Sequence, residues 1–377
     1  MNYNKIALEK HKVLKGKIAV APKDSVDSKE KLSIYYTPGV GAVSSYVAEH
    51  PDEARDFTWT NNSVAVVSDG SAVLGLGNIG PLGALPVMEG KCMLFKQFGD
   101  VDAVPIVLDV HTADEIVAAV KAIAPSFGGI NLEDIAAPIC FEVEDRLKKE
   151  LSIPVMHDDQ HGTAVVALAA LINACKVTGR KMEDLKIVIV GAGAAGVAIA
   201  NLLRKYANPT IFAVDSKGVI SKNRKDLNDA KRRLAEITNP SDVSGQLIDV
   251  LAGSNVFIGV SGPGILTAEL VKTMEKNPII IAMANPVPEI IPDEAKKAGV
   301  AVMATGRSDF PNQVNNSLAF PGIFRGALDN KVKQITDEHK VAAAEALAGL
   351  IKNPTPDKII PGPFEPGILE AVSSAIY

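Results

Sequence analysis

The stretch LKIVIVGAGAAGVAIANLLRKYANPTIFAVDS, residues 185–216, decides the fold of this chain. It predicts an apolar strand, a glycine-rich turn, a helix and a second apolar strand, one after another. Strands that are apolar throughout are typical of a parallel sheet whose two faces are both covered by helices. Apolar runs at 255–260, 279–285 and 301–305 continue the alternation of strands with helical segments. Together these segments indicate an α/β fold with a doubly wound parallel sheet.

The turn in this stretch carries the pattern G-x-G-x-x-G. Gly191 permits a tight turn, Gly193 lets the backbone approach a pyrophosphate, and Gly196 lets the helix pack closely on the strand. Free N–H groups at the start of the helix favour an anion there. Asp215 ends the second strand, where an acid accepts hydrogen bonds from an adenosine ribose. We therefore expect a Rossmann-type dinucleotide site, with the contact residues Gly191, Gly193, Ala194, Ala195, Gly196 and Asp215.

A second G-x-G-x-x-G occurs in LGLGNIG, residues 74–80, but without the same context. Its leading strand would span only residues 72–74, and Pro81 and Pro86 interrupt the segment after the glycines. No acid stands where the second strand of a dinucleotide unit would end. We expect this motif to form a turn near the site and the chain to bind a single dinucleotide.

The chain is long enough for two domains. It has 377 residues, of which 47% are hydrophobic and 22% charged, as in globular proteins. The change of rhythm before the glycine turn places the boundary near residue 160. We expect an N-terminal α/β domain at residues 1–160 and a Rossmann-type dinucleotide-binding domain at residues 161–377.

Charge and cysteine usage argue against several classes of protein. The net charge of −5 gives no reason to expect nucleic acid, and no basic run points to an anionic membrane. The longest apolar runs, such as residues 164–175, are expected to be too short to span a bilayer, and residues 1–17 lack the apolar core of a signal peptide. Cys92, Cys140 and Cys175 form no C-x-x-C, which favours buried thiols in a reducing cytoplasm.

Two pairs of adjacent acids follow predicted elements at turn positions. Glu133 and Asp134 belong to NLEDI, and Asp158 and Asp159 belong to MHDDQHGT. Adjacent carboxylates repel each other unless a cation or a proton lies between them. Several converging carboxylates suit Mg²⁺ or Mn²⁺, whereas either pair alone is also typical of a solvated loop or a helix cap.

His157 and His161 form H-D-D-Q-H, which is close to the zinc-protease pattern H-E-x-x-H. That pattern needs both rings on one face of a helix. We expect the helix to begin only near Gly162 and to run to about Thr178, so both histidines would lie on a turn. A histidine that orients the acids or caps the helix is the favoured interpretation.

The motifs of this chain, taken in order, resemble those of malic enzymes in their short bacterial and archaeal form. The resemblance runs from about residue 15 to about residue 375, and many motifs in one order are highly specific. It rests on IYYTPGVG, LGLGNIG, VMEGKCMLFKQFGDVDAVPIVLD, NLEDI, FEVED, IPVMHDDQHGTA, VGAGAAG, FIGVSGPGILT, MANPVPEI and NNSLAFPGIFRGAL. It implies metal-dependent oxidative decarboxylation of (S)-malate to pyruvate and CO₂, with NAD(P)⁺ as hydride acceptor and a homodimer or larger homo-oligomer as the assembly.

The resemblance also implies roles for individual residues. Lys91 of EGK matches the family's base, and Tyr36, immediately before Thr-Pro, matches its acid. Asp158 would lie beside the lysine and the metal. By the same resemblance the metal ligands are Glu133, Asp134 and Asp159, and the residues that hold substrate or cofactor are Lys91, Asn285 and Asn316, with Asn285 also beside the nucleotide.

These residue types suit the chemistry. The metal would chelate the C1 carboxylate and C2 hydroxyl of malate, and a lysine of lowered pKa would take the hydroxyl proton as hydride leaves C2. The metal would then stabilise the enolate as CO₂ departs, and Tyr36 would protonate C3. The chain departs from the longer animal-type enzymes at Ala72, where they carry an arginine that helps bind a substrate carboxylate.

The sequence leaves alternatives open. Asp215 favours NAD because a carboxylate repels a 2′-phosphate, yet Lys217, Lys222, Arg224 and Lys225 follow closely and could reach one. A decarboxylase acting on oxaloacetate would use the same acids, lysine and tyrosine. A nucleotide-sensing module without catalytic activity would have lost one of the acids, Lys91 or Tyr36, and none of these is lost.

Overall fold

The first sheet has four parallel strands in the order β2-β1-β3-β4. The structure is a computed structural model that describes residues 3–73 and 75–377. The strands are β1 (Ser63–Ser68), β2 (Asp102–Val107), β3 (Gly129–Leu132) and β4 (Val155–His157). Because all four run in the same direction, their carboxyl ends meet at one edge, and the residues that come after β3 and β4 are brought together there.

Helices cover both faces of this sheet. In β1, Val64 and Val66 belong to one buried core, and Ala65 and Val67 belong to another. The first core includes α5, and the second includes α6 and α7. This alternation results from the period of two along a strand. The helices are α5 (Gly80–Gly99), α6 (Ala113–Ile123) and α7 (Ile139–Glu150). The T-x-x-E sequence of residues 112–115 is typical of a capping box, and the structure has one between Thr112 and Glu115 at the start of α6.

The second sheet has the order β10-β9-β8-β5-β6-β7, with only β7 antiparallel to its neighbour among the described strands. Its strands are β5 (Lys186–Val190), β6 (Thr210–Asp215), β7 (Gly218–Val219), β8 (Val256–Gly259), β9 (Ile279–Ala282) and β10 (Val302–Thr305). The chain passes from β5 to β6 on one side and to β8 on the other. A crevice opens at such a reversal, at the carboxyl ends of the strands.

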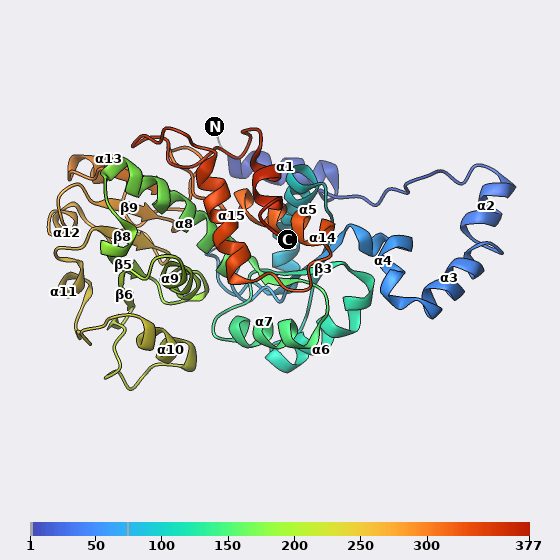
Figure 1. The fold of residues 1–377 in the computed structure, drawn as a ribbon, viewed down its shortest axis with the longest axis horizontal. Coiled ribbons are helices and arrows are strands. Elements are labelled where there is room, and N and C mark those ends of the chain that lie inside the picture. Colours follow the sequence, from blue (N-terminus) through green and yellow to red (C-terminus); the bar gives the residue numbers. More distant parts are fainter. Residues whose placement is uncertain (1–2, 74) are drawn as a thin grey trace.

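The second sheet is also covered on both faces. Ile187 and Ile189 of β5 pack in the core that contains α8 and α9, and Val188 and Val190 pack in the core that contains α11 and α12. The predicted doubly wound α/β fold is therefore confirmed (Figure 1). The helices are α8 (Asp158–Thr178), α9 (Ala194–Tyr206), α10 (Asp229–Ile237), α11 (Leu247–Leu251), α12 (Ala268–Val271) and α13 (Pro292–Lys297).

The last helices of the chain tie the two sheets together. They are α14 (Phe320–Asp329), α15 (Asp337–Gly349) and α16 (Ile368–Ser373). The ring of Phe95 in α5 lies 4.7 Å from that of Phe320 and 5.4 Å from that of Phe324, measured between centroids. Thus α14, which comes after the second sheet in the sequence, packs on the first (Figure 1). The division near residue 160 stays a prediction.

An N-terminal arm, defined here as residues 18–50, extends away from the two sheets (Figure 1). It carries α2 (Lys29–Tyr35) and α3 (Val40–Glu49), and it lies between α1 (Tyr3–Leu14) and α4 (Ala54–Phe57). No residue of the arm is buried in this chain. Several apolar side chains are exposed along it, namely Leu32, Ile34, Tyr35, Tyr36, Val40, Val43 and Tyr46.

Two local expectations are wrong. Instead of a strand at residues 72–74, Val73 forms an isolated bridge to Gly77, and Leu74 lies outside the described residues. The helix expected from Gly162 begins at Asp158, which lengthens it by one turn. With that turn, α8 is the one helix in the described ranges that is long and apolar enough to cross a bilayer, but 67% of its apolar window is buried inside the molecule.

The contact between α5 and α14 predicts a large loss of stability in Phe95→Ala. Phe95 is completely buried between two other rings, and emptying such a position costs about 3–5 kcal/mol of the free energy of unfolding. Leu82→Ala is the matched control, because Leu82 lies on the same helix and is 82% exposed. Urea unfolding monitored by fluorescence measures both. Equal losses in the two variants would contradict this view of the core.

Candidate functional site

Two pairs of acids meet at the carboxyl edge of the first sheet. Glu133 and Asp134 come directly after β3, and Asp158 and Asp159 come directly after β4. Strands β3 and β4 are neighbours, with their last residues in register. The backbone N–H of Asp134 donates a hydrogen bond of 2.7 Å to Oδ2 of Asp159, so the two loops are joined directly. The edge of the sheet therefore gathers the four acids that the sequence predicted.

Three of these acids can hold a cation. Oxygen atoms of Glu133, Asp134 and Asp159 lie within 4.8 Å of one another. Glu133 and Asp134 are buried, whereas the side chain of Asp159 is 33% exposed and leaves a way in. Carboxylate oxygens are the ligands that Mg²⁺ and Mn²⁺ prefer. The donor set therefore fits a hard divalent ion.

Lys91 lies beside these acids. Its Nζ is 2.6 Å from Oδ2 of Asp158 and 2.8 Å from Oε1 of Glu133, and it lies 4.2 Å from the centre of the Phe320 ring. Burial alone would lower the pKa of Lys91. The carboxylates of Asp158 and Glu133 outweigh that effect and hold the pKa above its usual range. Without a cation, Lys91 is therefore charged.

The acids of the cluster hold protons more tightly than free carboxyl groups. Burial raises the pKa of Asp158 to about 7, against the opposing effect of Lys91. Burial, again opposed by Lys91, raises the pKa of Asp159 to about 6, and it also raises the pKa of Glu133. This is the behaviour of carboxylates crowded around a place for positive charge.

Glycine is required one turn into α8. A Cβ added to Gly162 would overlap Oδ1 of Asp158, because that carboxylate folds back over its own helix. The same Cβ would stand 3.2 Å from the Cβ of Asn316, so the predicted substrate-binding Asn316 borders this turn. Gly162 is a residue that sequence reasoning did not assign to the site, although HDDQHG placed it next to the acids.

Residues 75–79 of the LGLGNIG motif form a loop in front of α5, the helix that carries Lys91, and Leu74 lies outside the described residues. The N–H groups of Ile79 and Gly80 both donate to the carbonyl of Gly70 and close this loop. A Cβ on Gly75 would lie 2.9 Å from the carbonyl oxygen of Asn285, which comes after β9 of the second sheet. The loop is thus a contact between the two halves of the molecule, as its position beside the site predicted.

Ala72 has a backbone role here. Its N–H donates a hydrogen bond of 2.9 Å to the carbonyl of Asp134 and so supports the acid loop.

Asn131, which the sequence interpretation did not single out, donates from Nδ2 to Oε2 of Glu133 at 2.8 Å. Asn131 is on β3 and Glu133 is the first residue after it, so the period of two along extended backbone is the signal that pairs them.

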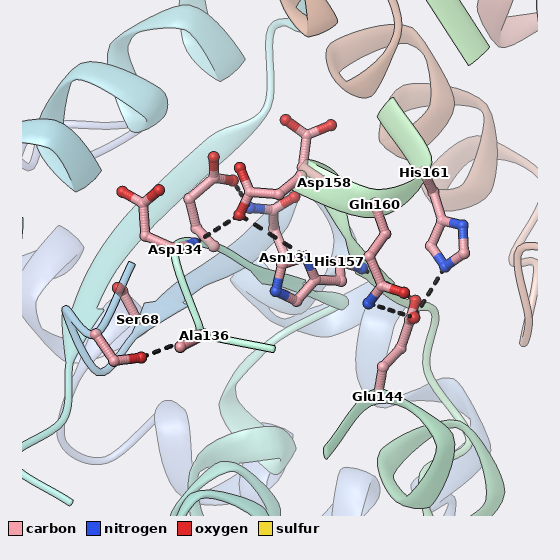
Figure 2. Close-up of polar contacts among 12 residues, drawn as sticks. Ser68, Asn131, Asp134, Ala136, Glu144, His157, Asp158, Gln160 and His161 are labelled. Carbon is pink, nitrogen blue, oxygen red and sulfur yellow. Dashed lines mark hydrogen bonds and ion pairs between the residues drawn. The ribbon is translucent and has the colours of Figure 1, made fainter. Parts of the chain in front are cut away.

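His157 and His161 do not act as a pair. His157 is fully buried, with its Nδ1 3.8 Å from Oδ2 of Asp159, and burial lowers its pKa. His161 lies on the first turn of α8, and its Nε2 is 2.8 Å from Oε2 of Glu144. Figure 2 shows Asp134 on one side of the first turn of α8 and Glu144 on the other. Among the described residues, the group suited to a metal contains only carboxylates.

The glycine turn of the second sheet lines a cavity of about 510 Å³. A Cβ on Gly196 would overlap the carbonyl of Gly191, and a Cβ on Gly191 would lie 2.6 Å from that of Val260. Both glycines are therefore needed for close packing. Ala137, only a few residues beyond the acids, lines the same cavity. The loop that follows the acids therefore reaches the cavity at Ala137. Its lining includes Gly191, Ala192, Gly193, Val214, Asp215 and Ser261.

Asp215 is already surrounded by cations. Its carboxylate accepts hydrogen bonds from Arg224 at 2.7 Å and 3.2 Å, from Lys231 at 2.5 Å, and from the backbone N–H of Lys217 at 2.9 Å. Burial would raise the pKa of Asp215, but Arg224 and Lys231 hold it below its usual value. Lys231, on α10, is a nucleotide-side residue that sequence reasoning missed, because it lies on the next helix rather than directly after the strand.

One predicted residue lies apart from the cluster. Tyr36 comes directly after α2 in the N-terminal arm, and its side chain is 67% exposed. The arm projects away from α5, which carries Lys91, and from β3, which is followed by Glu133 and Asp134 (Figure 1). Within one chain, the structure therefore brings together the acids and Lys91 but leaves Tyr36 outside.

Comparison with known proteins gives a consistent result. The profile described as "Malic enzyme, N-terminal domain" matches residues 15–148, and "Malic enzyme, NAD binding domain" matches residues 160–368. A bifunctional malic/malolactic enzyme of Bacillus subtilis is 52% identical, over 100% of this chain and 92% of its own length. An NAD-dependent malic enzyme of Geobacillus stearothermophilus is 54% identical, over 96% of this chain and 76% of its own.

Solved structures agree. The crystal structure of an NAD-dependent malic enzyme from Thermotoga maritima matches with a TM-score of 0.95 and 50% identity, over 98% of each chain. That of a malic enzyme from Pyrococcus horikoshii matches with a TM-score of 0.93 and 44% identity, over 97% of this chain and 89% of the other.

The raised pKa of Asp159 predicts that divalent ions bind more tightly as the pH rises. Below about 6 the carboxyl holds a proton that a cation must displace, and above that pH it does not. We expect the dissociation constant for Mn²⁺ to fall about fivefold from pH 5 to pH 6 and about tenfold from pH 5 to pH 7, and to level off above pH 7, as measured by the electron paramagnetic resonance of free Mn²⁺.

Asp159→Asn should weaken Mn²⁺ binding at least tenfold and flatten its pH dependence. Asp52→Asn, at an exposed acid far from the cluster in sequence, should change neither. Unaltered binding in Asp159→Asn would remove that residue from the metal site.

Proposed function

The chain belongs to the malic enzyme family, and from that premise we propose that it catalyses divalent-metal-dependent conversion of (S)-malate to pyruvate and CO₂, with hydride transfer to NAD(P)⁺. One observation supports this most strongly. Lys91 lies within 2.8 Å of Glu133 at the edge where three carboxylates can hold a cation, and the dinucleotide cavity opens beside that edge. Base, metal ligands and hydride acceptor can therefore meet at one substrate.

Lys91 moves the first proton. It must be neutral to accept the proton of the C2 hydroxyl as hydride leaves C2 for the nicotinamide. A divalent ion held by Glu133, Asp134 and Asp159 would supply polarisation of that hydroxyl and stabilisation of negative charge. When Glu133 binds the divalent ion, its carboxylate attracts the ammonium of Lys91 less strongly, and the lysine loses its proton more easily. Asp158, at 2.6 Å from Nζ, is placed to take the excess proton from Lys91.

The second half of the reaction needs a proton donor at C3. After CO₂ leaves, the bond electrons remain on C3 as an enolate, and a phenol can protonate that carbon. We assign this proton to Oη of Tyr36. Since Tyr36 lies on a projecting arm with no buried residue, we propose that it acts in the site of a second copy of the chain, within a homodimer or larger homo-oligomer.

We propose NAD as the preferred hydride acceptor and NADP as a poorer one. Asp215 lines the nucleotide cavity at the end of β6, where a carboxylate favours ribose hydroxyl groups over a 2′-phosphate. Arg224 and Lys231, which Asp215 binds, are the cations that could face such a phosphate. Relatives of both preferences exist, since NADP-dependent malic enzymes of Rhizobium meliloti and Escherichia coli are 47% and 43% identical.

The buried cysteines are consistent with a cytoplasmic enzyme. Cys92, Cys140 and Cys175 are free thiols inside the molecule. Burial raises the pKa of Cys140 and that of Cys175 to about 12, so these thiols are unreactive. They need no oxidising compartment, and we propose a cytoplasmic location on this ground.

The proposed function is tested by initial rates with malate, NAD⁺ and Mn²⁺, measured by NADH absorbance and product analysis. We expect one pyruvate per NADH and a loss of at least a thousandfold in Lys91→Met, because the variant lacks the amine that takes the hydroxyl proton. Lactate without net NADH would instead indicate the malolactic reaction named for the Bacillus subtilis relative. Decarboxylation of oxaloacetate without NADH formation from malate would contradict the proposal.

The nucleotide preference is tested by Asp215→Ser. Removing the carboxylate frees Lys231, leaves Arg224 paired with Asp226, and removes the repulsion of a 2′-phosphate, so kcat/KM should shift toward NADP at least tenfold relative to NAD. Asp229→Ser is the control, because its carboxylate pairs with Arg232 at the surface and does not line the nucleotide cavity. A shift of the same size in both variants would argue against the role of Asp215.

The placement of Tyr36 is tested by complementation. Tyr36→Phe and Lys91→Met should each be nearly inactive as single variants. Dimers that form at random from the two, when co-expressed in equal amounts, should regain about a quarter of wild-type activity, because half of the sites in each mixed dimer are intact. No recovery, with mixed dimers verified by affinity tags, would place Tyr36 in its own chain's site.

A further inference from the structure

A second cavity lies on the flank of α9, behind the active site. Its volume is about 680 Å³, within the range of small-molecule sites. It is walled by α7 from the first half of the molecule, by α9 and α10 from the second, and by α8 and α15. Phe141 lines both this cavity and the nucleotide cavity, and no other described residue lines both. A molecule bound there would touch both halves of the protein.

Cationic side chains surround this cavity. They are Lys148, Lys205, Arg233 and Lys340, against the three acids Glu144, Asp145 and Asp337. Arg233 stands exposed at the rim, with no ion pair to any described residue. It also lines the adjoining cleft between α7 and α10. The rim thus offers a free guanidinium, the group best suited to carboxylate and phosphate oxygens.

The back of the cavity holds a buried ammonium group. Lys340 is only 3% exposed, and its one ion pair within the described ranges is with Asp337, at 2.9 Å. Burial lowers the pKa of Lys340, and Lys148 lowers it further despite Asp337. The cation is therefore only partly compensated. An anionic group beside Lys340 would supply the missing charge.

Glu144 supplies only part of that charge, because its carboxylate is shared among four other groups. It accepts hydrogen bonds from the backbone N–H of His157 at 3.1 Å and from Gln160 at 3.2 Å, and it lies 2.8 Å from Nε2 of His161 and 2.6 Å from Nζ of Lys148. Figure 2 shows Glu144 below the start of α8, facing Gln160 and His161. Burial would raise the pKa of Glu144, but His161 and Lys148 hold it well below its usual range.

This wall of the cavity also carries the active site. His157 and Gln160 flank Asp158 and Asp159 in the chain, so Glu144 fixes the turn on which both acids stand. Lys148 is shared between Glu144 and the cavity. A ligand that draws Lys148 toward itself would weaken the hold of Glu144 on that turn.

We propose that this cavity binds a small organic anion bearing carboxylate or phosphate groups, held between Arg233 at the rim and Lys340 at the back. The apolar floor, formed by Val197, Leu202, Leu234 and Ile237, suits a short carbon chain between or beside the charged groups. Binding is coupled to turnover through Lys148 and Glu144, and this second part rests on the proposed function, whereas binding itself does not.

Calorimetric titration of the full chain tests the binding, with saturating NAD⁺ and no divalent ion. Succinate and glycerol 3-phosphate serve as probes and distinguish a carboxylate site from a phosphate site. We expect one of them to bind once per chain to the wild type and to Arg232→Gln. Arg233→Gln and Lys340→Met should bind it at least tenfold more weakly. Arg232 is the matched control, because it neighbours Arg233, pairs with Asp229 and does not line the cavity.

Binding of neither probe to the wild type would overturn the proposal, as would equal binding by Arg233→Gln and Arg232→Gln. Arg233 is exposed, so its variant folds even if Lys340→Met does not. For the coupling, the bound probe should change kcat or KM for malate at least twofold in Arg232→Gln and leave Arg233→Gln unchanged. Identical responses of the two variants would overturn the coupling, even where NADH formation from malate itself is normal.

Discussion

The ammonium of Lys91, held between the carboxylates of Asp158 and Glu133, is the interaction on which the rest of the structure depends. A charge this deeply buried is tolerated only when it is paired. Removing one partner leaves the other charge buried without compensation, at a large desolvation cost. Three separate elements must therefore meet at one point: α5, the end of β3 and the start of α8. The parallel first sheet brings the two acid loops together, and the packing of α5 on α14 holds the lysine over them.

The second sheet also places its functional loops at the carboxyl ends of parallel strands, but for binding a dinucleotide. Its strand order reverses at β5, and the glycine turn after that strand keeps the backbone close enough for a dinucleotide. Ala137 of the acid loop and Gly191 of the glycine turn line one cavity, so the two sheets present their carboxyl ends to a shared space. Gly75, in the loop in front of α5, lies so close to the backbone of Asn285 that a Cβ there would stand 2.9 Å from its carbonyl oxygen, so the two halves also approach each other at this point.

Local sequence predicted the parts of the molecule that depend on neighbouring residues. The glycine turn at Gly191, the capping box at Thr112 and the acids after the strands result from short-range rules and could be read directly. The start of α8 could not, because it depends on Glu144, which is distant in sequence and satisfies the N–H of His157. The position of Tyr36 could not be predicted either. No residue of the arm is buried in this chain, and the contact of Tyr46 with Phe57 lies at the far end of the arm from Tyr36, so no local pattern indicates where Tyr36 packs.

The central claim, that Glu133, Asp134 and Asp159 form the divalent-metal site beside Lys91, is tested most directly by crystals grown with Mn²⁺. An anomalous difference map collected near the manganese absorption edge locates the ion without reference to any catalytic assay. The account predicts one strong peak per chain within coordination distance of oxygen atoms from all three acids. A strong peak at His157 and His161, or no peak at the three acids in crystals that hold Mn²⁺ elsewhere, would contradict it.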